Sequence, residues 1–591
     1  MTDAEARSVA IGPMSQEGFS QQLLSLSIFD GIGEETFSAI EAELEWVDLR
    51  GGSTLFREGD QSKALYVVTH GRLGAFMRDA DGQEQLVAQI HAGETVGELG
   101  LISGEPRTAT LIGLRDSKLL RLTKSAFEKL IEQHPKAMQY VVQQLVGRLQ
   151  QAAPRSAPDD APRTFLIAPL DPGVAYADLA HDLAEALSGL GERVHLLDAE
   201  VAGQSTEWFH KIEAAHDRIL YLAEPKNSAW THRCFRQADR ILFVATGRAP
   251  QPDRPLVEPP STETPLPSLE LVLLQEPMAP QPGGAAPWLE RLHFDFHTHI
   301  RSENRADLAR LARLMTGRAV GLVLSGGGAR AITHIGVIRA LRRAGVPLDL
   351  VGGTSMGAII AAGIALEWDD EQLKHMLGRS FADSNPLSDY TLPLISLVRG
   401  RKVTNMLHDE FGEAQIEDLW RTYFCVSTNL TAGTPKVHRR GSLWKAIRAS
   451  ISLPGLLPPV IEEEQVLVDG GFINNLPGDV MRAMRRGPVI GVDAGTDRGL
   501  TSLATDLEEK SLWWLLRYGR KGVPGIVRIL MSAGTVSSTA QTIASRNQLD
   551  LLLQPPLGSL SLLDWKAYER AIDIGYRSTM ETLEQLETPL F

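Results

Sequence analysis

The first stretch of the chain with a clear hydrophobic pattern consists of short apolar runs broken by glycine and aspartate. From Leu23 to about Arg121 these runs include ALYVVTHGRLGAF, QLVAQI and KLLRL. Short strands separated by turn residues predict an antiparallel barrel or roll. Apolar residues at helical spacing then run from Lys124 to about Gln151, and the polar segment AAPRSAPDDAPR follows. We therefore expect one domain over residues 23–151, a β-roll with helices, and a linker behind it.

A different hydrophobic pattern begins at Thr164, where strand-like apolar runs alternate with amphipathic stretches. The strand-like runs are TFLIAPL, RVHLLD, RILYLA and RILFVAT, and ADLAHDLAEALSGLG between the first two has helical spacing. This alternation predicts a small parallel α/β layer over residues 163–247, serving as a spacer or scaffold. Residues 250–287 hold eleven of the 33 prolines. We therefore expect a proline-rich linker and connecting helix over residues 248–317, interrupted by the strand-like SLELVLLQ.

The pattern of strand, turn and helix returns at Val320 in AVGLVLSGGGARAITHIGVIRALRRAG. It continues through DLVGGTSMGAIIAAGIAL and VLVDGGFINNLP to VIGVDAG. These runs predict an α/β domain over residues 318–495. Residues 496–591 are mainly helical in pattern, with one apolar strand at LDLLLQP, and we expect them to form a helical extension of that domain.

Composition and charge narrow the class of protein. The 591 residues include 59 Lys and Arg against 73 Asp and Glu, a net charge of −14 without a dense basic block, which argues against nucleic acid as a partner. Two cysteines argue against a disulfide framework and fit a reducing compartment. No window approaches the roughly 18 apolar residues of a membrane span, and the N-terminus lacks the pattern of a secretory signal. We expect a cytoplasmic protein of about three or four domains.

The pentapeptide GTSMG matches G-x-S-x-G between an apolar strand and an apolar helix. That context is the one a nucleophile elbow requires, with Ser355 on a sharp turn at a helix N-terminus and Gly353 and Gly357 on either side. A tight glycine turn without chemistry is the alternative. In α/β-hydrolases the nucleophilic Ser is followed along the chain by the acid and then by the His. That order is excluded with Asp469 as the acid, because the last histidine, His438, precedes it.

Two further motifs supply the parts that a triad would otherwise provide. SGGGAR follows a strand and opens a helix, so the amides of Gly326, Gly327 and Gly328 suit a developing oxyanion, and Arg330 adds positive charge. A nucleotide phosphate loop is disfavoured, since G-x-G-x-x-G lacks its last glycine here. In VDGGFINNLP, Asp469 ends a strand and could take the Ser355 proton, although an Asx turn is the plainer alternative.

These three motifs, in this order, resemble the patatin-like phospholipase family. The resemblance runs from about Val320 to Val492 and implies a three-layer α/β hydrolase fold with a Ser–Asp dyad. It makes Ser355 the nucleophile and Asp469 the base, and it places the oxyanion hole in the glycine loop with Arg330. No cofactor is implied for catalysis. His334 matches the histidine of the family's usual AHIG-like segment, but we expect it to be a packed helix residue.

The first domain carries a second candidate site, in VGELGLISGEPRTAT. Glu98 can accept a ribose hydroxyl, and Arg107 can neutralise one phosphate across a glycine-rich turn. The segment resembles the phosphate-binding cassette of cyclic-nucleotide-binding domains, and the resemblance covers about residues 26–150. It implies cAMP or cGMP as a regulatory ligand, held by Gly97, Glu98, Arg107 and Thr108. A copy that has lost its ligand, or a docking module, is the alternative.

The complete order of segments is similar to proteins of the neuropathy target esterase type. WLERLHFDFHTHIR, IEDLW and RASISLPGLLPPV belong to this likeness. We expect this sequence to depart from that type in having one nucleotide module and no N-terminal membrane anchor. We expect the histidines of LHFDFHTHIR to pack or face solvent and to bind no metal, since neither cysteines nor suitably spaced acids accompany them. They are His293, His297 and His299.

The resemblance implies a serine acyl hydrolase acting on phospholipid or lysophospholipid esters. The alternative is a cyclic-nucleotide-sensing adaptor with a vestigial hydrolase domain, and a peptidase is a weaker third hypothesis. Without a span, contact with lipid should be peripheral. The stretch TLPLISLVRGRK, residues 391–402, joins an apolar loop to basic residues and could touch an anionic lipid surface, or could equally be a buried loop with solvated charges.

Overall fold

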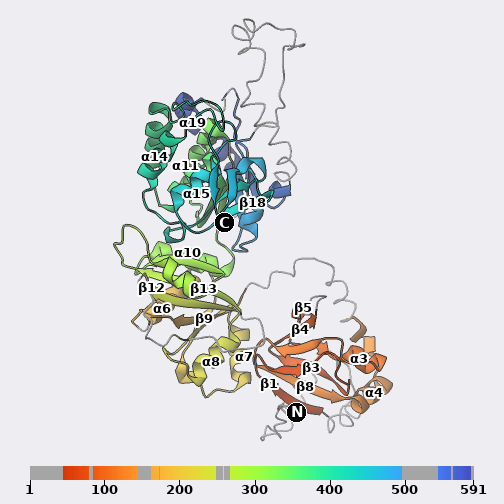
Figure 1. Ribbon diagram of the computed structural model, residues 1–591. Helices are drawn as coiled ribbons and strands as arrows, with labels where there is room; N and C mark the ends of the chain where they lie inside the picture. Colours follow the sequence, from red (N-terminus) through yellow and green to blue (C-terminus); the bar gives the residue numbers. More distant parts are fainter. Residues whose placement is uncertain are drawn as a thin grey trace, which may run out of the picture. The chain divides into compact units, whose positions relative to one another are not determined.

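The computed structural model describes residues 44–78, 84–136, 138–139, 141–143, 162–171, 173–247, 257, 267–495, 544–558, 560 and 564–586. The chain divides into two compact units. The first comprises Met1–Val244 and Pro252–Glu270, and the second comprises Ala245–Gln251 and Leu271–Phe591. Figure 1 labels the helices and strands of both units.

The first unit begins with two antiparallel four-stranded sheets, as the short apolar runs predict. One sheet has the order β1-β8-β3-β6 and the other β2-β7-β4-β5. The first sheet buries apolar side chains on both faces: Leu65 and Leu120 belong to one core, and Val68 and Leu119, on the same two strands, belong to a second core that the other sheet shares. Because successive side chains of a strand point to opposite faces, the β-roll has two small cores. The strands and helices are β1 (Leu44–Leu49), β2 (Thr54–Phe56), β3 (Ala64–His70), β4 (Arg72–Arg78), β5 (Glu84–His91), β6 (Thr95–Val96), α3 (Glu98–Ser103), β7 (Thr110–Gly113), β8 (Ser117–Thr123) and α4 (Lys124–Gln133).

The α/β layer follows, with its strands parallel in the order β10-β11-β9-β12. All six residues of β9 are buried, as expected for a central strand covered on both faces. The elements are β9 (Thr164–Pro169), α6 (Tyr176–Gly189), β10 (Val194–Leu197), α7 (Thr206–Ala215), β11 (Arg218–Leu222), α8 (Ala229–Gln237) and β12 (Arg240–Thr246). The predicted helical residues 144–151 and the predicted linker at 152–161 lie outside the described residues.

The segment predicted as a proline-rich linker is more regular than its composition suggests. It contains β13 (Ser268–Gln275), α9 (Ala285–Arg291), β14 (Phe296–Arg301) and α10 (Arg305–Thr316). Prolines at 277, 280 and 282 fall between β13 and α9, and Pro287 lies in the first turn of α9, where its missing amide costs no helical hydrogen bond. The prolines therefore separate the elements without breaking them.

The second unit is built on an eight-stranded mixed sheet. Its order is β19-β20-β17-β16-β15-β21-β22, with β18 paired to β17. Strands β15, β16, β17, β21 and β22 pair in parallel, whereas β18, β19 and β20 form the antiparallel edge. The strands are β15 (Gly321–Leu324), β16 (Leu350–Thr354), β17 (Thr422–Asn429), β18 (Thr434–His438), β19 (Val460–Glu462), β20 (Gln465–Asp469), β21 (Val489–Val492) and β22 (Leu551–Leu553).

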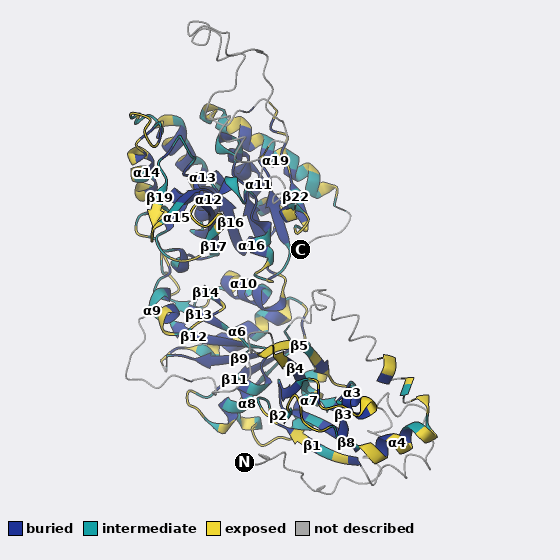
Figure 2. Ribbon diagram, turned by 45° about the vertical axis from the view of Figure 1, so that its right-hand side comes forward, coloured by how far each residue is buried: buried dark blue, intermediate teal, exposed yellow. Residues whose placement is uncertain are grey.

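Two separate apolar cores show that both faces of this sheet are covered. On β15, Leu322 and Leu324 belong to one core and Val323 between them to the other. Side chains two apart share a face of a strand, so the sheet lies between two layers. Figure 2 shows α12 and β16 as buried at the centre. The helices are α11 (Thr333–Arg343), α12 (Met356–Ala365), α13 (Asp370–Leu377), α14 (Arg401–Phe411), α15 (Leu443–Ser450), α16 (Gly478–Arg482) and α19 (Tyr568–Glu584).

Helix α19 packs closely on α11 although more than two hundred residues separate them. A Cβ on Gly336 would lie 1.9 Å from the carbonyl oxygen of Ile572, so only glycine allows the two backbones to approach this closely. Together with β22, this contact integrates the described part of the C-terminal extension into the α/β domain. The predicted helices between 496 and 543 lie outside the described residues.

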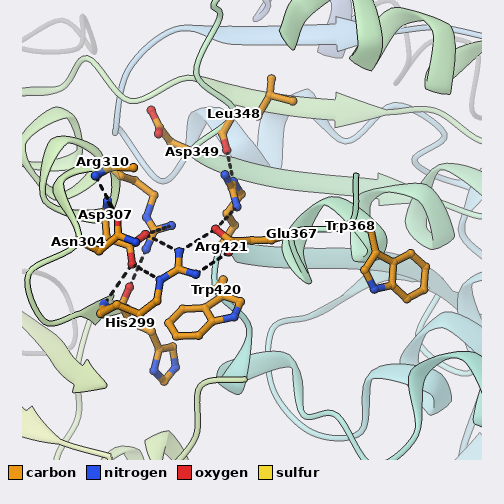
Figure 3. Close-up of polar contacts among 12 residues, drawn as sticks. His299, Asn304, Asp307, Arg310, Leu348, Asp349, Glu367, Trp368, Trp420 and Arg421 are labelled. Atoms are coloured by element: carbon orange, nitrogen blue, oxygen red, sulfur yellow. Dashed lines mark hydrogen bonds and ion pairs between the residues drawn. The ribbon is translucent and has the colours of Figure 1, made fainter. Parts of the chain in front are cut away.

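A cluster of ion pairs joins the end of β14 to the strands and helices around α12. Arg301 pairs with Asp307 on one side and with Glu367 on the other, at 2.8 Å in each case. Arg421 pairs with Glu367 at 2.7 Å and donates to the carbonyl of Leu348. Figure 3 shows Asp307, Glu367 and Arg421 around this cluster. Because Glu367 follows the C-terminal end of α12, the cluster fixes the helix whose other end begins at Ser355.

Candidate active site

Ser355 occupies the sharp turn between β16 and α12. Its φ of 56° and ψ of −125° place a non-glycine residue in a region that L-residues seldom adopt, a strain typical of functional turns. A Cβ on Gly357 would lie 2.3 Å from the carbonyl oxygen of Leu324, and one on Gly353 would lie 2.6 Å from the carbonyl carbon of Gly357. Both flanking glycines are therefore required by close backbone contact.

The hydroxyl of Ser355 donates a hydrogen bond to Asp469 Oδ2 at 2.7 Å. Asp469 ends β20 and is buried, with its Oδ1 accepting a hydrogen bond from the Gly471 amide at 2.8 Å. Burial raises the pKa of Asp469 to about 6, against the opposing effect of the hydrogen bonds from Ser355 and Gly471. The pair thus combines a hydroxyl with a carboxylate that is more basic than usual, which suits proton abstraction near neutral pH.

Two of the three histidines that follow Ser355 have other partners, and the third, His375, is exposed on α13. His438 Nε2 is hydrogen-bonded to Ser427 Oγ at 2.8 Å, and His408 is paired with Glu413. The Ser355 hydroxyl instead reaches the Asp469 carboxylate directly, so no imidazole stands between the acid and the nucleophile. The geometry is that of a dyad.

Two serines that the sequence did not single out hold the dyad in place. The Ser355 amide donates to Ser450 Oγ at 2.9 Å, and the Ser450 hydroxyl donates to the carbonyl of Val426. The Asp469 amide donates to the carbonyl of Ser452 at 2.9 Å. Both serines lie in the predicted motif RASISLPGLLPPV, but nothing local in that string indicates which partner each would meet.

The glycine loop lies against Ser355. A Cβ on Gly326 would come within 3.0 Å of Ser355 Cβ and 2.6 Å of Asn475 Oδ1. The Gly326 amide donates to the carbonyl of Asn475 at 3.3 Å. Within the described parts of the chain, the amides of Gly327 and Gly328 have no acceptor. These two amides are therefore better placed than that of Gly326 to receive an oxyanion.

Arg330 and His334 support this loop from behind. Arg330 Nε donates to the carbonyl of Leu560 at 2.9 Å, which ties the loop to the C-terminal extension. His334 is fully buried, and its Nε2 lies 2.9 Å from the carbonyl oxygen of Ser325. Burial lowers the pKa of His334 to about 4, so the ring is neutral at pH 7 and donates through Nε2. His334 is a packed helix residue that fixes the peptide before Gly326, as expected from the sequence.

The candidate nucleotide residues gather at the start of α3. Gly97 has a φ of 82°, and a Cβ there would lie 2.2 Å from Arg107 Nη1, so only glycine leaves space for the guanidinium. Arg107 donates to the carbonyls of Gly97 and Ala64 and lies 4.0 Å from the ring centre of Phe56. Burial lowers the pKa of Arg107, while charges including that of Glu98 oppose the effect.

This arrangement brings Gly97, Glu98 and Arg107 together and leaves Thr108 exposed beside them. Arg107 Nε is buried and has no acceptor among the described residues. A buried cation with an unused donor is a group that an anionic ligand could satisfy. Binding would compete with the two backbone carbonyls that the guanidinium now contacts.

Two histidines of β14 contact the same backbone carbonyl. His297 and His299 both hydrogen-bond the carbonyl of Glu417, at 3.1 and 2.8 Å. Burial lowers the pKa of His297 to about 4 and that of His299 to about 3. No cluster of three or more metal-ligating side chains occurs in the residues the structure describes, and no described helix has the length and apolar character needed to cross a bilayer.

Three family models match consecutive segments of the chain. The patatin-like phospholipase model matches residues 322–481, the range that contains the elbow, the glycine loop and the strand ending in Asp469. The second unit carries a patatin-like domain. A cyclic nucleotide-binding domain model matches residues 46–134, and a neuropathy target esterase family P-loop like domain model matches residues 162–318. The last range unites the α/β layer with the predicted linker, although the turn after β9 lacks the G-K-[ST] pattern of a phosphate loop.

Curated relatives match nearly the whole of this chain. Patatin-like phospholipase domain-containing protein 6 of Homo sapiens is 31% identical over 90% of this chain and 44% of its own length. Neuropathy target esterase sws of Drosophila melanogaster is 30% identical over 90% of this chain and 42% of its own length. Lysophospholipase nte1 of Aspergillus terreus is 28% identical over 93% of this chain and 42% of its own length. The chain spans less than half the length of these relatives. The resemblance to patatin-like phospholipases, predicted from the motifs, is confirmed.

Proposed function

We propose that the chain is a serine acyl hydrolase that cleaves fatty-acyl esters of phospholipids or lysophospholipids. The observation that carries this proposal is the 2.7 Å hydrogen bond from Ser355 Oγ to the buried carboxylate of Asp469. The names of the relatives, a lysophospholipase and patatin-like phospholipase domain proteins, support the same substrate class. The proposed reaction uses no cofactor, because the dyad and the glycine-loop amides supply nucleophile, base and oxyanion donors.

The reaction begins when Asp469 takes the Ser355 proton as the oxygen attacks the ester carbonyl carbon. The carbonyl oxygen becomes an oxyanion, which the amides of Gly327 and Gly328 stabilise together with the positive end of α12. The tetrahedral intermediate collapses, and the leaving alkoxide takes the proton from Asp469. Water then attacks the acyl-enzyme with Asp469 as base, which releases the fatty acid and restores the Ser355 hydroxyl.

A nucleotide-sensing adaptor with a vestigial hydrolase domain is the alternative function. It would not require the strained turn at Ser355 or the raised pKa of Asp469, both of which cost stability and serve catalysis. The peptidase hypothesis gains no support from the described residues. The hydrolase is therefore the better account of the geometry.

The test is fatty-acid release from lysophosphatidylcholine by the full chain, with Ser355→Ala and Asp469→Asn as variants. Each variant should lower the rate by at least about a thousandfold, because each removes a group that acts in the reacting centre. Ser384→Ala, a surface hydroxyl change in the same unit, is the matched control. Full activity in Ser355→Ala would contradict the proposal. Ser355-dependent cleavage of casein without lipid hydrolysis would favour a peptidase.

We further propose that cAMP or cGMP binds at Gly97, Glu98, Arg107 and Thr108 and alters the rate of hydrolysis in a cytoplasmic, peripherally membrane-associated enzyme. Calorimetry with each nucleotide tests binding, and Arg107→Ala should weaken it by about tenfold or more through loss of the charged phosphate contact. Arg78→Ala, an exposed change on β4, is the control. If titration with cAMP and with cGMP released no heat of binding, the binding proposal would be contradicted. An unchanged rate of hydrolysis at saturating nucleotide would contradict regulation.

A further inference from the structure

Exposed apolar side chains gather in one loop of the patatin-like domain, before α14. Leu394 is 90% exposed, Leu392 79%, Tyr390 74% and Ile395 73%. Isolated exposed apolar residues are ordinary, but four within six positions form a patch that soluble proteins use for binding. Of the two alternatives predicted for residues 391–402, the structure shows the exposed loop.

The base of this loop is fixed even though its tip is exposed. Tyr390 and Val398 form an antiparallel bridge, and the Thr391 amide donates to the carbonyl of Leu397 at 3.0 Å. Val398 is fully buried in the main core of the domain. The apolar tip is therefore presented by an anchored frame, and residues 392–395 project from it.

The same frame connects the loop to the dyad. The amides of Leu397 and Val398 donate to the carbonyls of Gly455 and Leu456, at 2.9 and 3.1 Å. Those two residues follow Ser450 and Ser452 closely in the chain, and these serines bind the amides of the dyad residues. Only a few residues of continuous backbone separate the base of the loop from the groups that position Ser355 and Asp469.

Charge distinguishes this patch from an ordinary apolar surface. Residues 390–402 contain three cations, Arg399, Arg401 and Lys402, and no acidic residue, although the whole chain has a net charge of −14. All three cations are exposed. Apolar side chains flanked by Lys and Arg are the combination that binds anionic lipid surfaces, since the side chains enter the interface and the cations meet the headgroups.

We propose that residues 390–402 form a docking surface that inserts Leu392, Leu394 and Ile395 into an anionic lipid surface and brings the Ser355 site to its substrate. The purpose assigned to this surface rests on the proposed lipid hydrolysis. The binding itself does not depend on catalysis, so the two can be tested apart.

The first test is flotation of the full chain with vesicles, using the Ser355→Ala background so that no lipid is consumed. Vesicles of phosphatidylcholine alone are compared with vesicles that also contain phosphatidylserine. The double change Leu394→Ser and Ile395→Ser should lower partitioning onto the mixed vesicles by about tenfold or more. Met278→Ser, a change at an apolar residue that is 91% exposed elsewhere in the same unit, should leave it unchanged.

The second test addresses the cations. Arg399→Ala with Arg401→Ala should lower binding to the mixed vesicles by about fivefold per charge and reduce the difference between the two vesicle types. Added salt should weaken binding of the parent and have a smaller effect on this variant. Thermal melting of each variant reports whether the fold is intact.

Unchanged vesicle binding in folded loop variants would overturn the inference. Loop variants that keep vesicle binding but change the oligomeric state seen by light scattering would overturn it as well, because the surface would then dock a second copy. If the parent binds vesicles through the loop but hydrolyses no lipid, the docking surface stands and the proposed function fails. If it hydrolyses lipid while the loop variants bind vesicles normally, the function stands and the docking surface fails.

Discussion

The backbone amide of Ser355 donates a hydrogen bond to the hydroxyl of Ser450 at 2.9 Å, and this contact helps to hold the strained turn at Ser355. The Ser450 hydroxyl is itself fixed by the carbonyl of Val426 at 2.7 Å. Since Ser450 ends α15 and Ser355 precedes α12, the position of the nucleophile depends on how these two helices pack.

Ser450→Ala should therefore lower kcat while leaving KM nearly unchanged. The variant removes the acceptor of a turn amide, a loss of about 1–3 kcal/mol, which corresponds to roughly 5- to 160-fold in rate if it appears in the transition state. Steady-state kinetics on lysophosphatidylcholine measure the two constants, with Ser384→Ala as the control. An increase in KM at constant kcat would show that Ser450 acts on substrate binding instead.

Hydrolysis should require the ionised form of Asp469. Burial, opposed by the hydrogen bonds from Ser355 and Gly471, raises the pKa of this carboxyl to about 6, so kcat/KM should fall tenfold per pH unit below that value. A pH profile on a water-soluble short-chain ester, which avoids changes in lipid packing, measures the break. A profile that stays flat down to pH about 4 would exclude a buried carboxylate as the base.

The same carboxylate should destabilise the folded protein at neutral pH. Its folded-state pKa of about 6 exceeds the ordinary value of 3.8, so its contribution favours folding below about pH 4 and is lost as pH rises through 6. Asp469→Asn removes the charge and should raise the free energy of unfolding at pH 8 by up to about 3 kcal/mol. Denaturant unfolding at pH 8 and at pH 4 tests this, and a gain of equal size at both values would contradict it.

Substitution of Glu367, which lies far from the reacting groups, should lower the free energy of unfolding. Burial raises its pKa, but its hydrogen bonds and charge interactions with Arg301 and Arg421 outweigh this and lower it. Glu367→Gln removes the acidic partner of Arg421 and leaves Arg301 with Asp307 alone, and because these side chains are partly exposed it should cost about 1–3 kcal/mol of stability. Unfolding followed by tryptophan fluorescence suits this test because Trp368 and Trp420 lie in the same region (Figure 3). Glu581→Gln on the exposed side of α19 is the control, and equal stability of the two variants would contradict the role of the cluster.

The parts of the fold and site that could be predicted are those encoded by neighbouring residues. The elbow at Ser355 follows from GTSMG between an apolar strand and helix, and the β-roll follows from short strands with glycine turns. Contacts that depend on the folded chain left no local signal. Nothing near Ser450 in the sequence indicates that its hydroxyl meets Ser355, 95 positions earlier.

Predictions made from composition differ from the structure where contacts with distant segments determine the fold. Proline content predicted a linker over residues 248–317, yet β14 forms from FHTHIR, whose two histidines contact the Glu417 carbonyl and whose Arg301 pairs with Glu367. The glycine loop was predicted as a set of equivalent amides, whereas the Gly326 amide is engaged by Asn475. In each case the partner comes from a distant segment, and its identity is fixed only by packing.

Covalent labelling with a fluorophosphonate, followed by mass spectrometry of the peptides, tests the role of Ser355 most directly. The probe reacts with an activated serine and leaves a stable adduct, so it reports the nucleophile without reference to the lipid chosen. We expect one adduct, on Ser355, that is absent in Ser355→Ala and forms at least about a hundredfold more slowly in Asp469→Asn. An adduct on another serine, or an unlabelled Ser355 in a chain that still hydrolyses lysophosphatidylcholine, would contradict the assignment of Ser355 as the nucleophile.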